Sequence, residues 1–342
     1  MIRNNAKWII FTLLLVFVGS ALIPVFSKFF GDTPSVSGGS TVDVKPLPDI
    51  TIPKFNADTA YILTGKLVSF GPRVTSTEGA TKVKKWIVEG FKKAGADVIE
   101  QNFKDKTYDG KPLNCTNIIA RYNLQATKRI VLSAHWDSRQ VADQDSTRPK
   151  EPIVGADDSG SAIAMLMEIG HQLQAQPLSN VGVDIVLFDA EDMGEKNSEN
   201  GWCIGSKYWA ANPHTPNYVA SYGILLDMAG AKGARFTKEM ISQKFAPSVV
   251  EKVWRVARQK YGYDHLFVEE TSRGPLTDDH VYVNQIAKIP MIDIINHPVN
   301  SFFGEYWHTH HDDMSVIDKE TMRAVGQTLL GVLHYEQVGA FQ

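Results

Sequence analysis

Short apolar runs alternate along most of the chain with longer segments of helical periodicity, and this alternation restricts the fold more than any other feature. Strands are predicted at residues 117–122, 129–134, 184–188, 222–226 and 289–295. Helices are predicted at residues 83–94, 159–174, 247–261 and 319–335, and the first of them follows Thr75 and Glu78, which have capping-box spacing. Strands that alternate with helices predict an α/β sheet with helices on both faces.

The N-terminus carries an uncharged, mostly apolar run at residues 8–27, preceded by Arg3 and Lys7. A run of about 20 residues can cross a hydrocarbon core as a helix, and basic residues before it place the rest of the chain outside the cytoplasm. Residues 1–30 are therefore expected to be a signal anchor or a signal peptide. Small residues at 19–21 suit cleavage, whereas the apolar residues that continue beyond them favour a retained anchor.

The remainder divides into a linker and one domain. Residues 31–50 are rich in Gly, Ser, Thr and Pro and predict a flexible linker, which leaves residues 51–342 for a single folded domain. We expect this domain in a periplasm or a secretory lumen, either anchored to the membrane by residues 8–27 or secreted after cleavage.

Charge and cysteine content exclude several classes of protein. The formal net charge is −3, which provides no basic field for nucleic acid. Two cysteines, Cys115 and Cys203, exclude a disulfide scaffold and a four-cysteine zinc module. Whether these two cysteines pair is left open, and the sequence does not define the oligomeric state.

Acidic and imidazole side chains recur where predicted strands end or loops follow. The segments concerned contain His135 and Asp137, then Asp157 and Asp158, then Glu191 and Asp192, then Asp227, and finally His308. The 10 histidines and 38 acidic residues make single pairs expected by chance, but not this repeated placement. Burying such groups without partners costs several kcal/mol each. A divalent metal removes that cost, and imidazole with carboxylate suits zinc.

This order of motifs resembles the zinc-dependent aminopeptidase superfamily over roughly residues 57–342. The resemblance implies a single α/β domain around a central mixed β-sheet. In the C-terminal third, Asp278-Asp279-His280 and the later Trp307-His308-Thr309 resemble the animal-type glutaminyl cyclases of that superfamily. These enzymes convert an N-terminal glutamine of peptides or proteins into pyroglutamate with release of ammonia, and they use one zinc ion per chain.

The resemblance implies a role for each matching residue. The implied zinc ligands are Asp158, Asp192 and His308. The implied catalytic groups are Glu191 as general acid/base, with Asp227 and Asp278 in an acidic network beside it. The implied substrate-binding residues are Trp202, Phe303 and Trp307, although the spacing before Trp202 departs from the family pattern. His135 matches a segment that supplies a ligand to a second metal in aminopeptidases, so it is expected to be a neighbour of the zinc ligands or a second-metal ligand.

Several alternatives remain at this level. Asp192 stands where the family usually has Glu, which is one methylene longer. Asp227 could be a helix cap, and Asp278 could serve only to cap a helix or a turn. The five-residue set of His135, Asp158, Asp192, Asp227 and His308 would also suit a two-zinc aminopeptidase, and a non-catalytic domain could retain the same fold.

Overall fold

The computed structural model describes residues 45–299 and 301–341. Leu47–Gln342 form one compact unit. The predicted anchor or signal peptide lies outside the described residues, as does most of the predicted linker. Within the described ranges, no helix has the length and apolar content needed to span a membrane.

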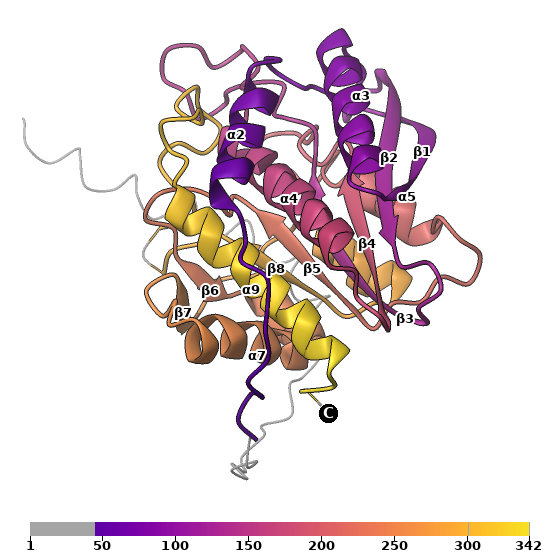
Figure 1. Ribbon diagram of the computed structural model, residues 1–342. Helices are drawn as coiled ribbons and strands as arrows, with labels where there is room; N and C mark the ends of the chain where they lie inside the picture. The colour runs from indigo at the N-terminus through magenta and orange to yellow at the C-terminus, as the bar shows by residue number, and fades with distance from the viewer. Residues whose placement is uncertain (1–44, 300, 342) are drawn as a thin grey trace, which may run out of the picture. The chain divides into compact units, whose positions relative to one another are not determined.

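A mixed sheet of six strands forms the centre of the domain (Figure 1). Across the sheet, the strands follow the order β1 (Asp97–Lys106), β2 (Pro112–Tyr122), β4 (Val181–Phe188), β3 (Lys128–His135), β5 (Tyr222–Asp227) and β8 (Met291–Ile295). β1, β2 and β4 pair antiparallel, whereas β4, β3, β5 and β8 pair parallel. A separate two-stranded sheet contains β6 (Phe236–Lys238) and β7 (Phe267–Thr271). The predicted α/β fold with a mixed sheet is confirmed.

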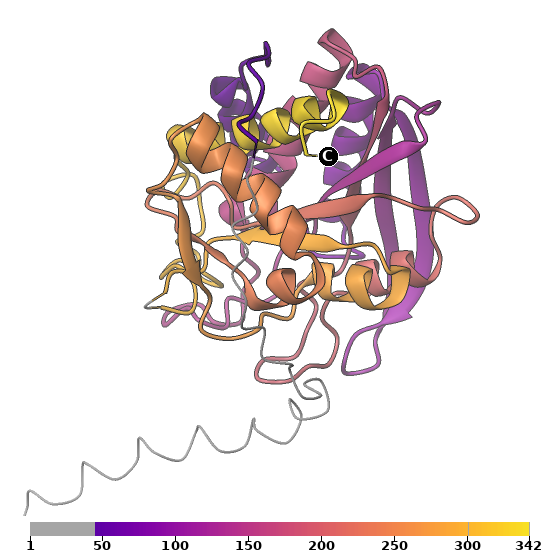
Figure 2. The same ribbon diagram turned by 90° about the horizontal axis from the view of Figure 1, so that it is seen from below.

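Helices cover both faces of the central sheet (Figures 1 and 2). The α-helices are α2 (Ala57–Val68), α3 (Glu78–Lys93), α4 (Ala162–Ala175), α5 (Ile204–Ala211), α6 (Met240–Phe245), α7 (Pro247–Arg255), α8 (Asp279–Tyr282) and α9 (Lys319–Gln337). Three π-helical turns, η1 (Ala156–Ser161), η2 (Val256–Lys260) and η3 (Val283–Ala287), adjoin α4, α7 and α8. The covering helices leave the strand ends free to carry polar side chains.

The hydrophobic core has two parts, one on each face of the central sheet, because successive side chains of a strand point to opposite faces. Ile130 and Leu132 of β3 join the large cluster that includes residues of α2, α3, α4, α7 and α9, while Val131 joins a smaller cluster with Trp209 of α5. Successive side chains of a strand point to opposite faces, so one strand serves both cores. Because the central strands are buried on both faces, they appear in the sequence as continuous apolar runs.

Several element boundaries differ from the sequence prediction, and two of these differences have a clear tertiary cause. The cap of α3 is Thr77, whose side chain accepts from the Ala80 N–H, whereas the Thr75 hydroxyl donates to Asp189 at 2.8 Å. The helix predicted from residue 159 starts as η1, where the backbone angles of Asp158 and Ser159 are not helical, and regular α4 begins at Ala162. Both corrections lie beside the polar strand ends, where tertiary contacts override the local pattern.

A buried ion pair joins the two central parallel strands. Arg129 of β3 donates to both carboxylate oxygens of Asp184 of β4, each at 2.6 Å, and Asp184 is fully buried. Arg121 and Asp97 form a comparable pair at the sheet edge, where the Asp97 side chain is 47% exposed. The first pair therefore stabilises a charge that water does not reach, whereas water solvates the second.

Arg129→Met is expected to lower the free energy of unfolding by about 3–5 kcal/mol, because the buried Asp184 carboxylate would lose its bidentate partner. The matched variant Arg121→Met should cost at most about 1 kcal/mol, since its pair is exposed. Denaturant unfolding of both variants measures the difference. Equal losses would contradict the assignment.

Candidate metal and active site

The side chains singled out at strand ends do meet at one edge of the sheet. His135 is the last residue of β3 and Asp227 the last of β5, while Glu191 and Asp192 follow β4. Asp158 approaches from η1, and His308 approaches from the loop before α9. Ligands of parallel α/β sheets bind at this carboxyl edge. Asp227 ends a strand, so it is not a helix cap.

Asp158, Asp192 and His308 form a compact, buried group. Ligand atoms of the three residues lie within 4.8 Å of one another. The His308 Nε2 is 3.3 Å from Asp192 Oδ1 and 3.7 Å from Asp158 Oδ2. Neither carboxylate oxygen of Asp192 has a hydrogen-bond donor among the described residues. Such orphaned oxygens are costly unless a cation binds them, and the donor set fits zinc.

Electrostatics at this group also favour a cation. Burial raises the pKa of Asp192 and the nearby Asp158 raises it further, although His308 opposes the shift. For His308 itself, burial lowers the pKa, but Asp192 and Asp143 more than offset this and raise it to about 9. Both shifts show that the buried carboxylates of this group favour a nearby positive charge, which a divalent cation would supply.

Three further carboxylates hold these residues in place. Asp143 accepts from Nδ1 of His308 at 2.9 Å, leaving Nε2 directed at Asp158 and Asp192. Asp137 accepts the backbone N–H groups of Glu191 and Asp192 at 3.0 and 3.1 Å. Asp312 does the same for the N–H groups of Asp157 and Asp158 at 2.7 and 3.1 Å. A carboxylate on the far nitrogen of a metal-binding histidine is the usual arrangement in metal sites.

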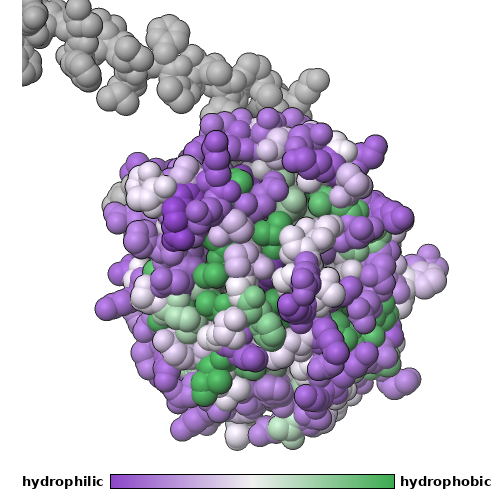
Figure 3. All heavy atoms as spheres, turned by 90° about the horizontal axis from the view of Figure 1, so that it is seen from above, coloured by the Kyte–Doolittle hydropathy of each residue, from purple (hydrophilic) through white to green (hydrophobic). Residues whose placement is uncertain are grey.

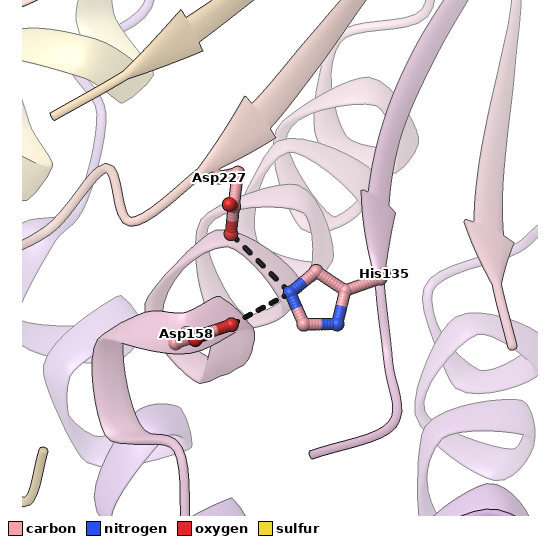
Figure 4. A group of neighbouring side chains, drawn as sticks. All are labelled: His135, Asp158 and Asp227. Carbon is pink, nitrogen blue, oxygen red and sulfur yellow. Dashed lines mark hydrogen bonds and ion pairs between the residues drawn. The ribbon is translucent and has the colours of Figure 1, made fainter. Parts of the chain in front are cut away.

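A second group of potential metal ligands surrounds His135 (Figure 4). One nitrogen of its ring, Nε2, lies 2.9 Å from Asp158 Oδ1 and 3.3 Å from Asp227 Oδ1. Burial raises the pKa of Asp227 to about 7, with the hydrogen bond from His135 opposing the shift. His135 thus bridges the first group to Asp227, and this geometry is compatible with either a neighbour of the zinc ligands or a second-metal ligand.

A third group of close polar side chains consists of Glu191, Asp278 and Cys203. Oxygen and sulfur atoms of these three side chains lie within 4.8 Å of one another. Desolvation raises the pKa of Glu191 well above its usual range; His135 opposes this, while Asp192 and Asp278 add to it. Asp278 caps α8 by accepting the Asp279 N–H at 2.5 Å, and its Oδ2 has no hydrogen-bond partner among the described residues. Asp278 therefore caps a helix, and its carboxylate also lies beside Glu191, so the cap is not its only contact.

The three expected substrate-binding aromatics lie around His308. The Trp307 ring stacks on the His308 ring at 3.8 Å and packs against Phe303 at 4.8 Å between centroids. Trp202 is parallel to His308 at 6.2 Å and lies over Arg139 at 4.5 Å. All three aromatics are only partly exposed.

On the face shown in Figure 3, hydrophobic side chains form separate patches among hydrophilic ones.

Sequence reasoning missed several residues that build this site. Arg139 is 1% exposed and donates to the carbonyls of Asp192 and Gly194 and to Asp143. Tyr306 donates to Asp157 at 2.6 Å. Arg73 is fully buried and donates to the Asp158 carbonyl at 3.0 Å. The open question on cysteine pairing is answered, since Cys115 and Cys203 are both free and buried.

The comparisons with known proteins now decide the family. The model of "Peptidase family M28" matches residues 117–333. The chain belongs to this family. The crystal structure of Porphyromonas gingivalis glutaminyl cyclase matches with a TM-score of 0.80 at 43% identity, over 82% of this chain and 99% of that one. A Zn-dependent exopeptidase from Parabacteroides distasonis also matches with a TM-score of 0.80 at 43% identity, over 83% and 99%.

A curated relative gives the same picture at lower identity. The glutaminyl-peptide cyclotransferase of Drosophila melanogaster is 27% identical in an alignment of 278 positions that covers 73% of this chain and 73% of that protein. The aligned region therefore accounts for most of both proteins, and the M28 member described here is similar to cyclases named from Porphyromonas gingivalis and from Drosophila melanogaster.

Asp143→Asn is expected to weaken zinc binding about 10- to 100-fold, because His308 would lose the charged partner that orients its ring. The matched control is Asp145→Asn, which removes the partner of His310, at 2.8 Å in the same loop. Chelator competition on purified protein measures both affinities. Wild-type affinity in the Asp143 variant would show that this contact does not support a metal ligand.

Proposed function

We propose that this chain is a zinc-dependent glutaminyl-peptide cyclotransferase that acts on peptides or proteins with an N-terminal glutamine. The observation that carries the proposal is the placement of Glu191, with its raised pKa, beside Asp278 and next to the Asp158–Asp192–His308 group. The 43% identity to a glutaminyl cyclase over nearly its whole length supports the same activity.

The proposed zinc ligands are Asp158, Asp192 and His308. When bound there, zinc supplies Lewis acidity toward the side-chain amide carbonyl of the substrate glutamine, which is otherwise a poor electrophile. Trp202, Phe303 and Trp307 form the proposed pocket for that side chain. Their aromatic surfaces exclude water and orient the substrate, which lowers the entropic cost of ring closure.

Glu191 moves the proton in this reaction. A free α-amine has a pKa near ~8, so part of it is neutral and nucleophilic at pH 7. A new bond forms between the α-nitrogen and the side-chain carbonyl carbon. Glu191 accepts a proton from the α-nitrogen and returns it to the amide nitrogen, the old C–N bond breaks, and ammonia leaves. Asp227 and Asp278 are proposed to keep Glu191 protonatable, since nearby carboxylates disfavour its charged form.

Glu191→Gln should lower kcat by roughly 10²–10⁴-fold, because an amide cannot carry the proton. The variant should keep its zinc. Mass spectrometry of a peptide beginning Gln-Ala follows loss of ammonia without chain shortening, and a chelator should abolish it. The control Glu199→Gln changes an exposed carboxylate of the same loop and should behave as wild type. Normal cyclisation by the Glu191 variant would refute its assigned role.

A second candidate, a two-zinc aminopeptidase, is favoured by one observation: His135, Asp158 and Asp227 form another group of potential ligands. Metal analysis of the purified protein separates the two activities. One tightly bound zinc ion per chain supports the cyclase, whereas two zinc ions and release of free glutamine from the same peptide support the peptidase. In the second case His135 would be a metal ligand.

We also propose that the domain works outside the cytoplasm, tethered by residues 8–27. The basis is the apolar run after Arg3 and Lys7. The full chain should sediment with membranes and be released by detergent but not by salt, while a chain starting at residue 31 should not sediment. A mature protein whose N-terminal sequence starts near residue 21 would instead establish cleavage and secretion.

A further inference from the structure

Cys203 touches the proposed general acid/base at two points. Its Sγ is 3.2 Å from Oε1 of Glu191, and its backbone N–H donates to the Glu191 carbonyl at 2.9 Å. The next N–H, of Ile204, donates to the Ala190 carbonyl at 3.1 Å. These contacts close the loop between the two residues at its base. The thiol is therefore held against the Glu191 carboxyl by the backbone that carries both.

The thiol is the donor in this contact. Burial raises the pKa of Cys203 well above its usual value and Glu191 raises it further, so the sulfur keeps its proton. A protonated thiol is a weak donor, and a carboxylate is a strong acceptor. Among the described residues, Oε1 of Glu191 has this one donor and Oε2 has none. The two oxygens of the carboxyl are thus in different environments.

The side chain of Cys203 is not used in the way expected at its position. Cys203 is the N-cap of α5, where a polar side chain usually accepts a backbone N–H of the first turn, yet Cys203 makes no such bond. Its φ of 53° lies in the left-handed region, which favours glycine. The backbone at this position suits glycine, yet the residue is a cysteine. Its side chain points to Glu191 and not to the first turn of α5.

We propose that Cys203 is a positioning residue for the cyclisation: its thiol holds Oε1 of Glu191, which leaves Oε2 to take and return the proton of the reacting nitrogens. A carboxylate oxygen of Asp278 lies within 4.8 Å of the Glu191 carboxyl and the Cys203 sulfur. Without the thiol contact, repulsion between the two carboxylates would turn the Glu191 side chain away from Asp278. This inference rests on the proposed function and adds to it a group that does not touch the substrate.

The test compares both buried cysteines in the full chain. Cys203→Ala removes the donor, and Cys203→Ser keeps a donor at nearly the same place. The matched controls are Cys115→Ala and Cys115→Ser, since Cys115 is also buried but lies in an apolar cluster with Phe103 and Leu113. For each variant, kcat and KM for a Gln-Ala peptide, the zinc content and the thermal midpoint are measured.

Cys203→Ala is expected to lower kcat about tenfold with KM changed less than about twofold. The reason is that the Glu191 carboxyl, which this variant would misplace, acts in the transition state and not in substrate binding. Cys203→Ser should recover most of kcat, and zinc content should not change. The proposal is overturned if Cys203→Ala retains the kcat of Cys115→Ala, or if the alanine and serine variants at 203 lose kcat equally. Absence of ammonia release from the unmodified chain would instead refute the proposed function itself.

Discussion

Buried negative charge at the carboxyl edge of the sheet is the constraint on which the rest of the site depends. Asp158, Asp192 and Asp227 are each less than one-tenth exposed, and Asp158 belongs both to a close group with Asp192 and to one with Asp227. Charges in such a place must be matched by cations, protons or N–H donors, because water does not solvate them. Raised pKa values at Asp192 and Asp227, together with the ring nitrogens of His135 and His308, meet part of this demand, and a divalent cation would meet the rest.

Carboxylates that accept backbone N–H groups are as important as those that face the pocket. Asp137 and Asp312 each accept from two consecutive N–H groups, and these belong to the segments that carry Glu191 and the two proposed acidic ligands, Asp158 and Asp192. Arg73 and Arg139 bind carbonyl oxygens of the same segments. The loops at the strand ends are thus fixed through their backbones, so their side chains are placed before any ligand arrives.

The sequence predicted the central strands and the residues that end them, because apolar runs and their polar ends are local features. Predicted strand ends carried His135, Glu191, Asp192 and Asp227, and the resemblance to the zinc-dependent aminopeptidase superfamily added Asp158 and His308 to the same site. It did not predict that Asp143 holds His308, since 165 residues separate the two and no local pattern links them. The cap of α3 moved from Thr75 to Thr77 for a related reason: Asp189, from another part of the chain, binds the Thr75 hydroxyl.

The packing of Trp202 has a consequence for how the pocket adapts. A Cβ on Gly194 would lie 2.0 Å from atoms of the Trp202 indole, and Arg139 covers the ring while donating to the Gly194 carbonyl at 2.8 Å. The indole is therefore wedged within its own loop. As a wall of the proposed substrate pocket, an indole held in this way would lose little conformational freedom on binding, and it would exclude ligands whose shape does not fit rather than move to accommodate them.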